Sequence, residues 1–173
     1  MDKIQKTENG CCYGKIAGLE KPVSRMIFGT AIRSMMEGKN ADEILDAALT
    51  KGINTFDTAR GYERAEESLG SWMKRRGNRD QVVIISKCGN CDSDGSVCVN
   101  RKVIETELAE SLQALQTDYI DIYLLHRDDP KTPVSEMIDT LNELQKAGKI
   151  KVFGVSNWTH ERIEEANSYA KEH

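Results

Sequence analysis

The sequence has no long apolar run, and its first six residues are too polar to form a secretory signal. A membrane-spanning helix needs about 20 mostly apolar residues, so we expect no segment to cross a membrane. Basic residues are not in excess: 24 Lys and Arg stand against 28 Asp and Glu, for a net charge of −4. This balance argues against nucleic acid as a partner, because nucleic-acid binding usually needs a basic face. We therefore expect a cytoplasmic protein that acts on a small molecule.

Cysteine is sparse and odd in number: Cys11, Cys12, Cys88, Cys91 and Cys98. Without a secretory signal, an odd number indicates reduced thiols rather than a disulfide framework. Cys88 and Cys91 have the spacing of metal ligands, and Cys98 could add a third ligand. No second C-x-x-C pair or nearby histidine completes a tetrahedral site. We expect no metal and interpret these thiols as free groups in a surface loop, with a metal or redox role as the alternative.

Strand-like and helix-like patterns alternate from about residue 23 to the last residue. Asn40 is predicted to cap the first helix in a capping box with Glu43, and Pro133 to lie in the first turn of the fourth. A continuous apolar run at 82–85 is typical of a strand buried on both faces. The predicted strands are residues 26–28, 53–56, 82–85, 119–125 and 150–155, and the predicted helices are 40–51, 63–75, 101–115, 132–147 and 161–171.

Repeated strand–helix units predict a parallel sheet with right-handed crossovers. Two architectures fit: an open doubly wound sheet and part of a (β/α)₈ barrel. The barrel is favoured, because no G-x-G-x-x-G signature follows the first strand and candidate chemical groups follow several different strands. A whole barrel needs about 250 residues. We therefore predict one partial barrel domain over residues 1–173 with about five of eight units, in which residues 1–12 are flexible.

Four groups at the carboxyl ends of successive strands could together reduce a carbonyl: Asp57, Tyr62, Lys87 and His126. A free phenol has a pKa of about 10, and a nearby ammonium lowers the pKa of a phenol. We expect Tyr62 to be the general acid, with Lys87 as that ammonium and Asp57 as its partner. His126 would hydrogen-bond the substrate oxygen. The hydride must come from a cofactor, because no side chain supplies one.

Each of these residues also has a purely structural interpretation. Asp57 could organise a turn, and Tyr62 could be a half-exposed loop residue. Lys87 could snorkel from a buried strand, and His126 could bond to backbone. Four such coincidences at one face are harder to accept than one catalytic group, so the catalytic interpretation is favoured.

Further polar groups follow the fourth and fifth predicted strands. Ser156 and Asn157 could recognise the carboxamide of a nicotinamide, or they could cap the next helix. The pair Asp128–Asp129 resembles an acid–base pair, but it precedes a proline in a polar loop, and we interpret it as solvated. Trp158 could stack on a ligand ring or pack at the rim of the core.

Four segments resemble the aldo-keto reductase family, in order and in spacing: G-I-N-T-F-D-T-A-R-G-Y, I-S-K, D-Y-I-D-I-Y-L-L-H and G-K-I-K-V-F-G-V-S-N. The resemblance runs from about Tyr13 to the last residue. It implies a barrel enzyme that reduces aldehydes and ketones to alcohols with NADPH, less often NADH. The catalytic tetrad that it implies is Asp57, Tyr62, Lys87 and His126.

The resemblance also implies how the cofactor is held. Ser156 and Asn157 would bind the nicotinamide amide, and Gly29, Thr30 and Asp57 would lie near the nicotinamide. Residues 13–24 resemble the hairpin that closes the bottom of the family's barrel, and residues 25–173 would form the first five units. The family's grip on the cofactor pyrophosphate follows strands seven and eight, which are absent from this sequence.

Two other functions stay open at this point. The first is a catalytically incomplete fragment, or a non-catalytic module of the same fold that binds a partner through its unpaired sheet edges. The second is a lyase in which Lys87 forms a Schiff base with the substrate. A further departure from the family is Arg127, which stands where many members have tryptophan and makes a more polar pocket.

Overall fold

A five-stranded parallel sheet forms the centre of the computed structural model, which describes residues 5–6, 12–91 and 94–172. Its strands pair in chain order, each parallel to the next, so every connection crosses over the sheet. The strands are β4 (Ile27–Gly29), β5 (Thr55–Asp57), β6 (Val83–Cys88), β7 (Ile120–Leu125) and β8 (Ile150–Val155).

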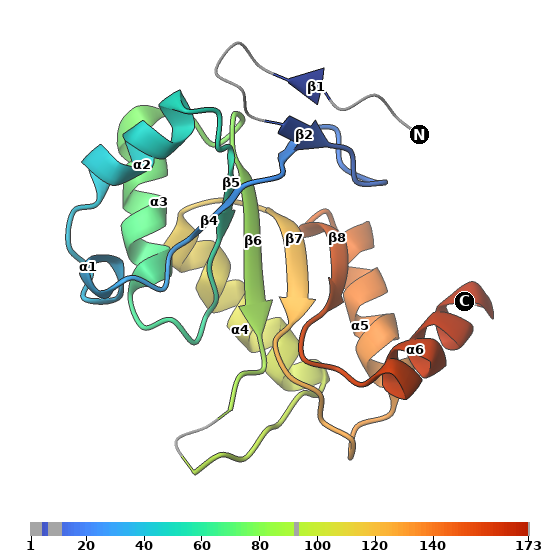
Figure 1. Cartoon of the computed structure of the whole chain (residues 1–173). Helices are drawn as coiled ribbons and strands as arrows, with labels where there is room; N and C mark the ends of the chain where they lie inside the picture. The colour runs from blue at the N-terminus through green and yellow to red at the C-terminus, as the bar shows by residue number, and fades with distance from the viewer. Residues whose placement is uncertain (1–4, 7–11, 92–93, 173) are drawn as a thin grey trace.

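The crossovers carry the helices, and Figure 1 shows α3, α4 and α5 along one face of the sheet. Each predicted strand and helix is present, with bounds that differ by one to three residues at most ends. The helix α1 was not predicted. No helix in the described ranges is long and apolar enough to cross a membrane. The helices are α1 (Arg33–Met36), α2 (Asp42–Thr50), α3 (Ala65–Arg76), α4 (Arg101–Leu115), α5 (Val134–Lys146) and α6 (His160–Glu172).

The two faces of the sheet bury different sets of side chains, because successive residues of a strand point to opposite sides. The helix-covered face contributes Ile84 and Tyr123 to the main core, where Trp72 of α3 is also fully buried. The other face contributes Val83 and Ile122 to a second cluster. Both faces are thus apolar, as the continuous run at residues 82–85 predicted.

A small antiparallel sheet lies near the N-terminal ends of the parallel strands (Figure 1). It consists of β1 (Gln5–Lys6), β2 (Cys12–Gly14) and β3 (Val23–Ser24). Tyr13 pairs with Ser24, which confirms the hairpin predicted over residues 13–24. Ser24 N also donates to Asn54 Oδ1 at 3.0 Å, directly before β5. The flexibility predicted for residues 1–12 falls mostly outside the described residues.

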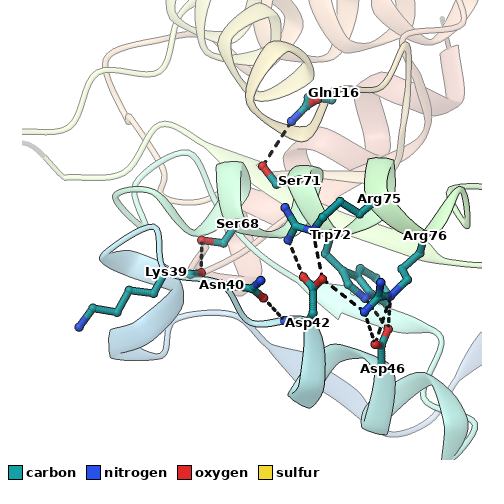
Figure 2. A network of polar contacts seen from close by, with 10 residues as sticks. All are labelled: Lys39, Asn40, Asp42, Asp46, Ser68, Ser71, Trp72, Arg75, Arg76 and Gln116. Carbon is teal, nitrogen blue, oxygen red and sulfur yellow. Dashed lines mark hydrogen bonds and ion pairs between the residues drawn. The ribbon is translucent and has the colours of Figure 1, made fainter.

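Charged groups join α2 to α3 on the outer surface of the molecule (Figure 2). Trp72 Nε1 donates to Asp46 Oδ1 at 2.8 Å, and Arg76 forms an ion pair with the same carboxylate at 2.7 Å. Arg75 Nε donates to Asp42 Oδ2 at 3.0 Å. These contacts hold α2 against α3.

Cys88 contradicts the interpretation of the cysteines as one surface loop. It is the last residue of β6 and only 1% exposed, and burial raises the pKa of its thiol to about 12. Cys91 and Cys98 are exposed free thiols in the loop that follows, while Cys11 lies outside the described residues. Within the described ranges, no group of three His, Cys, Asp or Glu side chains is placed to hold a metal ion.

Candidate active site

Strand alternation places the candidate groups on one face of the sheet. Ile85 belongs to the second cluster and Leu124 packs against it, and both point away from the helices. Lys87 lies two residues after Ile85 in β6. His126 lies two residues after Leu124, just beyond β7, where its N still donates to Cys88 O. Both side chains therefore point to the same side at the carboxyl edge. Asp57 pairs with Ile85 in the register of β5 and β6. Three strand ends thus converge on one edge.

Lys87 and Asp57 form the ion pair that the sequence predicted. Lys87 Nζ lies 2.7 Å from Asp57 Oδ1, and it also donates to Thr58 O at 2.9 Å. The lysine side chain is 8% exposed and the aspartate side chain 29% exposed. Because the lysine ammonium is nearly buried, its two acceptors hold it in one position. This contact favours a paired, positioned lysine over one that reaches out to solvent.

The ring of Tyr62 contacts both the Lys87 amine and the His126 imidazole. Lys87 Nζ is 4.9 Å from the ring centroid, within the range of a cation–π contact. The rings of Tyr62 and His126 are 5.7 Å apart between centroids and meet edge to face at 77°. Tyr62, which follows β5, thus contacts both Lys87 of β6 and His126, which follows β7.

The His126 imidazole lies in an electropositive and largely buried place. Burial lowers its pKa below the ordinary 6.5, the charges of Lys87 and Arg127 lower it further, and Asp57 acts in the opposite direction. The ring is therefore neutral at pH 7 and carries one N–H donor. Its Nδ1 atom is buried without a hydrogen-bond partner in the described structure. A buried unpaired nitrogen is costly, so a polar partner at this position would be favourable.

Asn157 and Ser156 follow β8 at the same edge. Asn157 Nδ2 donates to His126 O and to Ser156 Oγ, both at 2.9 Å, and its backbone has φ of 60°. Helix capping does not explain either residue, because Thr159 Oγ1 accepts the hydrogen bond from Arg162 N at the start of α6. The amide is thus held beside the histidine rather than used by the helix.

Gly29 and Thr30 complete the edge from the side of β4. Gly29 pairs with Asp57, and Thr30 N donates to Asp57 O at 2.9 Å. Two hydroxyl oxygens, Thr30 Oγ1 and Thr58 Oγ1, are buried and have no hydrogen-bond partner among the described residues. Both side chains are 0% exposed and lie two residues after Phe28 and Phe56 of the main core, so strand alternation directs them to the helix-covered face rather than into the edge.

Asp128 and Asp129 are not a solvated pair, contrary to the sequence interpretation. Asp129 is 6% exposed, and its Oδ2 accepts from Val99 N at 3.1 Å. Asp128 forms an ion pair of 3.0 Å with Arg162, whose guanidinium also lies 5.4 Å from the Trp158 ring. These side chains join the loops after β6, β7 and β8. These contacts could not be predicted from the sequence, because the residues that form them are up to 63 positions apart.

Comparison with known proteins identifies relatives of the chain. The model of the aldo/keto reductase family matches residues 25–173. Aldo-keto reductase YhdN of Bacillus subtilis is 38% identical over 170 residues, which cover 93% of this chain and 51% of that protein. Norsolorinic acid reductase B of Dothistroma septosporum is 35% identical over 146 residues, covering 78% of this chain and 37% of the relative.

A solved structure has the same arrangement of strands and helices. Aldo-keto reductase AKR11C1 from Bacillus halodurans, in its holo form, matches with a TM-score of 0.78 and 31% identity, over 91% of this chain and 54% of that one. The predicted fold class is thereby confirmed: these are parallel β/α units of a (β/α)₈ barrel with an N-terminal hairpin. The chain spans about half the length, or less, of the relatives it matches. It belongs to the aldo/keto reductase family.

Proposed function

We propose that this site reduces aldehydes and ketones to alcohols, with NADPH or NADH as the hydride donor. The observation that supports this most strongly is the meeting of Tyr62, Lys87 and His126 at one strand edge. A phenol, a buried ammonium and a neutral imidazole suit the delivery of one proton to an oxygen that becomes negative. Membership of the aldo/keto reductase family points to the same chemistry.

Tyr62 supplies the proton in this proposal. As hydride reaches the carbonyl carbon, the carbon–oxygen π bond breaks toward oxygen, and the proton of the Tyr62 hydroxyl moves to that oxygen. The Lys87 ammonium stabilises the phenolate that remains, and Asp57 holds the ammonium in place. His126 is neutral and donates a hydrogen bond to the carbonyl oxygen. A positioned general acid contributes a factor of about 10² to 10⁴ in rate.

The residues present fit the nicotinamide end of such a cofactor. A bound nicotinamide cofactor supplies hydride. His126 offers an unpaired ring nitrogen at the strand edge, and the backbone of Gly29 and Thr30 lies beside Asp57 there. Ser156 and Asn157 would hold the carboxamide group there. The chain's own residues thus orient the reactive end, while the residues that would hold the pyrophosphate are not among them.

The contacts of Lys87 bear on the alternative lyase chemistry, and the exposed cysteines bear on the cell compartment. The Lys87 ammonium donates two hydrogen bonds, to a carboxylate and to a carbonyl, and this arrangement does not favour a nucleophilic amine with a free lone pair. The contacts of Lys87 thus argue against a lyase that forms a Schiff base. The exposed free thiols of Cys91 and Cys98 support the cytoplasm, where thiols stay reduced, as the compartment.

Deuterium transfer tests the proposal. The protein is mixed with NADPH that carries deuterium at the transferable position and with an aromatic aldehyde, and the alcohol is analysed by mass spectrometry. We expect one deuterium on the alcohol carbon and a much slower reaction in Tyr62→Phe. An alcohol without deuterium, or no alcohol together with measurable binding of NADPH, would contradict the proposal.

A further inference from the structure

Glu66 is a buried carboxyl group that the proposed reaction does not use. It lies in the first turn of α3, it is 2% exposed, and burial raises its pKa. Ser86 Oγ donates a hydrogen bond to Glu66 Oε1 at 2.5 Å. Ser86 directly precedes Lys87 in β6, and strand alternation puts the two side chains on opposite faces. The bond therefore joins α3, just after Tyr62, to the back of the strand that carries Lys87.

The segment 58–66, which carries Tyr62, is attached to the end of β6 on both sides of the tyrosine. Before it, Lys87 Nζ donates to Thr58 O at 2.9 Å, and Arg60 N donates to Lys87 O at 3.0 Å. After Tyr62, the attachment to β6 is the hydrogen bond from Ser86 Oγ to the Glu66 carboxyl group. A segment fixed at one end only has more conformational freedom than one fixed at both. The backbone on both sides of Tyr62 is thus tied to β6, the strand that carries Lys87.

We propose that Glu66 is a positioning residue for Tyr62, which acts through its hydrogen bond to Ser86. The carboxyl group lies behind the sheet and reaches none of the proposed reacting atoms, so its effect passes through the backbone of α3. Ala65 N donates to Tyr62 O at 2.9 Å, which ties the start of the helix to the tyrosine itself. The expected loss of catalytic rate rests on the proposed function. The expected displacement of the Tyr62 ring does not.

Fluorine NMR measures the place of the ring without turnover. The protein is labelled with 3-fluorotyrosine, and the resonance of Tyr62 is assigned from its loss in Tyr62→Phe. The test variants are Ser86→Ala, which removes the donor, and Glu66→Gln, which keeps an acceptor for the serine. The control is Ser68→Ala, because Ser68 is also a buried serine and lies in α3. Its hydroxyl donates to Met35 O at 2.9 Å rather than to β6.

Figure 2 shows this control serine directed toward the backbone of Lys39, on the side of α3 that packs near α1 and α2. We expect Ser86→Ala to shift and broaden the Tyr62 resonance and Ser68→Ala to leave it in place. Glu66→Gln should retain the native resonance. A Tyr62 resonance that stays at the native position in Ser86→Ala would overturn the inference. If Ser86→Ala does not fold, Ser86→Cys keeps only a weak donor and must show the same shift.

Enzyme kinetics then separate the two proposals. Displacement of a catalytic group by about 1 Å can lower a rate about 10²-fold, so we expect at least a tenfold fall in kcat for Ser86→Ala. The KM for NADPH should not change, since the cofactor contacts lie on other strands. A shifted resonance in a protein that reduces no aldehyde would refute the proposed function and support the positioning role. Normal turnover with a shifted resonance would show that the place of the ring does not matter, and would refute the catalytic consequence.

Discussion

Asp57→Asn and Lys87→Met should affect stability to different degrees, although both should abolish rapid reduction. In Asp57→Asn a lysine side chain that is 8% exposed keeps its charge but loses its charged partner. Removal of one partner of a buried ion pair costs about 3–5 kcal/mol. Asp57 is 29% exposed and Lys87 keeps the bond to Thr58 O, so the loss should be smaller, about 2 kcal/mol.

In Lys87→Met the buried charge itself is removed. Methionine is of similar length and flexible, and the remaining aspartate can turn to water because it is already part-exposed. We expect a loss of stability below about 1 kcal/mol, because the charge left without a partner is on the 29% exposed aspartate rather than on a buried group. Reduction of an aldehyde should still fall by about 10² to 10⁴, because the phenolate loses its cation.

Urea unfolding, followed by the fluorescence of the buried Trp72, measures both changes in free energy. Glu143→Gln is the control, because it removes one partner of the exposed ion pair with Arg101 and should leave stability unchanged. The reasoning is wrong if Lys87→Met destabilises the protein more than Asp57→Asn does. It is also wrong if the free energy of unfolding of Asp57→Asn lies within about 0.5 kcal/mol of that of the control.

Three further predictions follow from burial. Burial holds the pKa of His126 in the folded protein below 6.5, so on acidification the unfolded chain takes up this proton before the folded protein does. The free energy of unfolding should therefore fall as the pH drops below 6.5. This contribution should be absent in His126→Gln. Burial raises the pKa of Cys88 to about 12, so a thiol reagent at about pH 8 should modify Cys91 and Cys98 at once and Cys88 only after unfolding. Gly70→Ala should destabilise the protein by about 1–3 kcal/mol, measured by urea unfolding, because the added Cβ would lie 2.4 Å from a backbone oxygen of α4.

Each of these predictions has a matched control. His160→Gln changes an exposed histidine paired with Glu164 and should leave the pH dependence in place. Peptide mass spectrometry distinguishes the three thiols. Rapid modification of Cys88 in the folded protein would contradict its burial at the end of β6. Ser71→Ala, in the same helix as Gly70, should not destabilise the protein. A Gly70→Ala variant more stable than the native protein would mean that helix propensity, about 1 kcal/mol in favour of alanine, outweighs the clash.

The sequence predicted the sheet and most helices because apolar periodicity records burial directly. The run at residues 101–115 has the same bounds as α4, and 150–155 the same as β8. Helix starts were less accurate. Asn40 does not cap α2; its Oδ1 accepts from Asp42 N in a turn before the helix, and the cap is Ala41. Local side-chain bonds of this kind compete with capping, and residue order does not decide between them.

The meeting of Asp57, Tyr62, Lys87 and His126 was predictable, because parallel strands carry their carboxyl ends to one edge. The bond between Glu66 and Ser86 was not. A glutamate in the first turn of a helix usually faces solvent, and only the packing of α3 on β6 buries this one. Asp129 was misread for the same reason. The polarity of a loop reveals neither the burial of its side chains nor the backbone groups they reach across the chain.

The most direct test of the central claim is the rate of aldehyde reduction at saturating NADPH in the native protein, in Tyr62→Phe and in Tyr169→Phe. The second variant removes a phenol that bonds to Asp139, far from the strand edge. We predict a fall of about 10² to 10⁴ for Tyr62→Phe and no change for Tyr169→Phe. Equal rates for the native protein and Tyr62→Phe would contradict the account, because the proton would then come from another group.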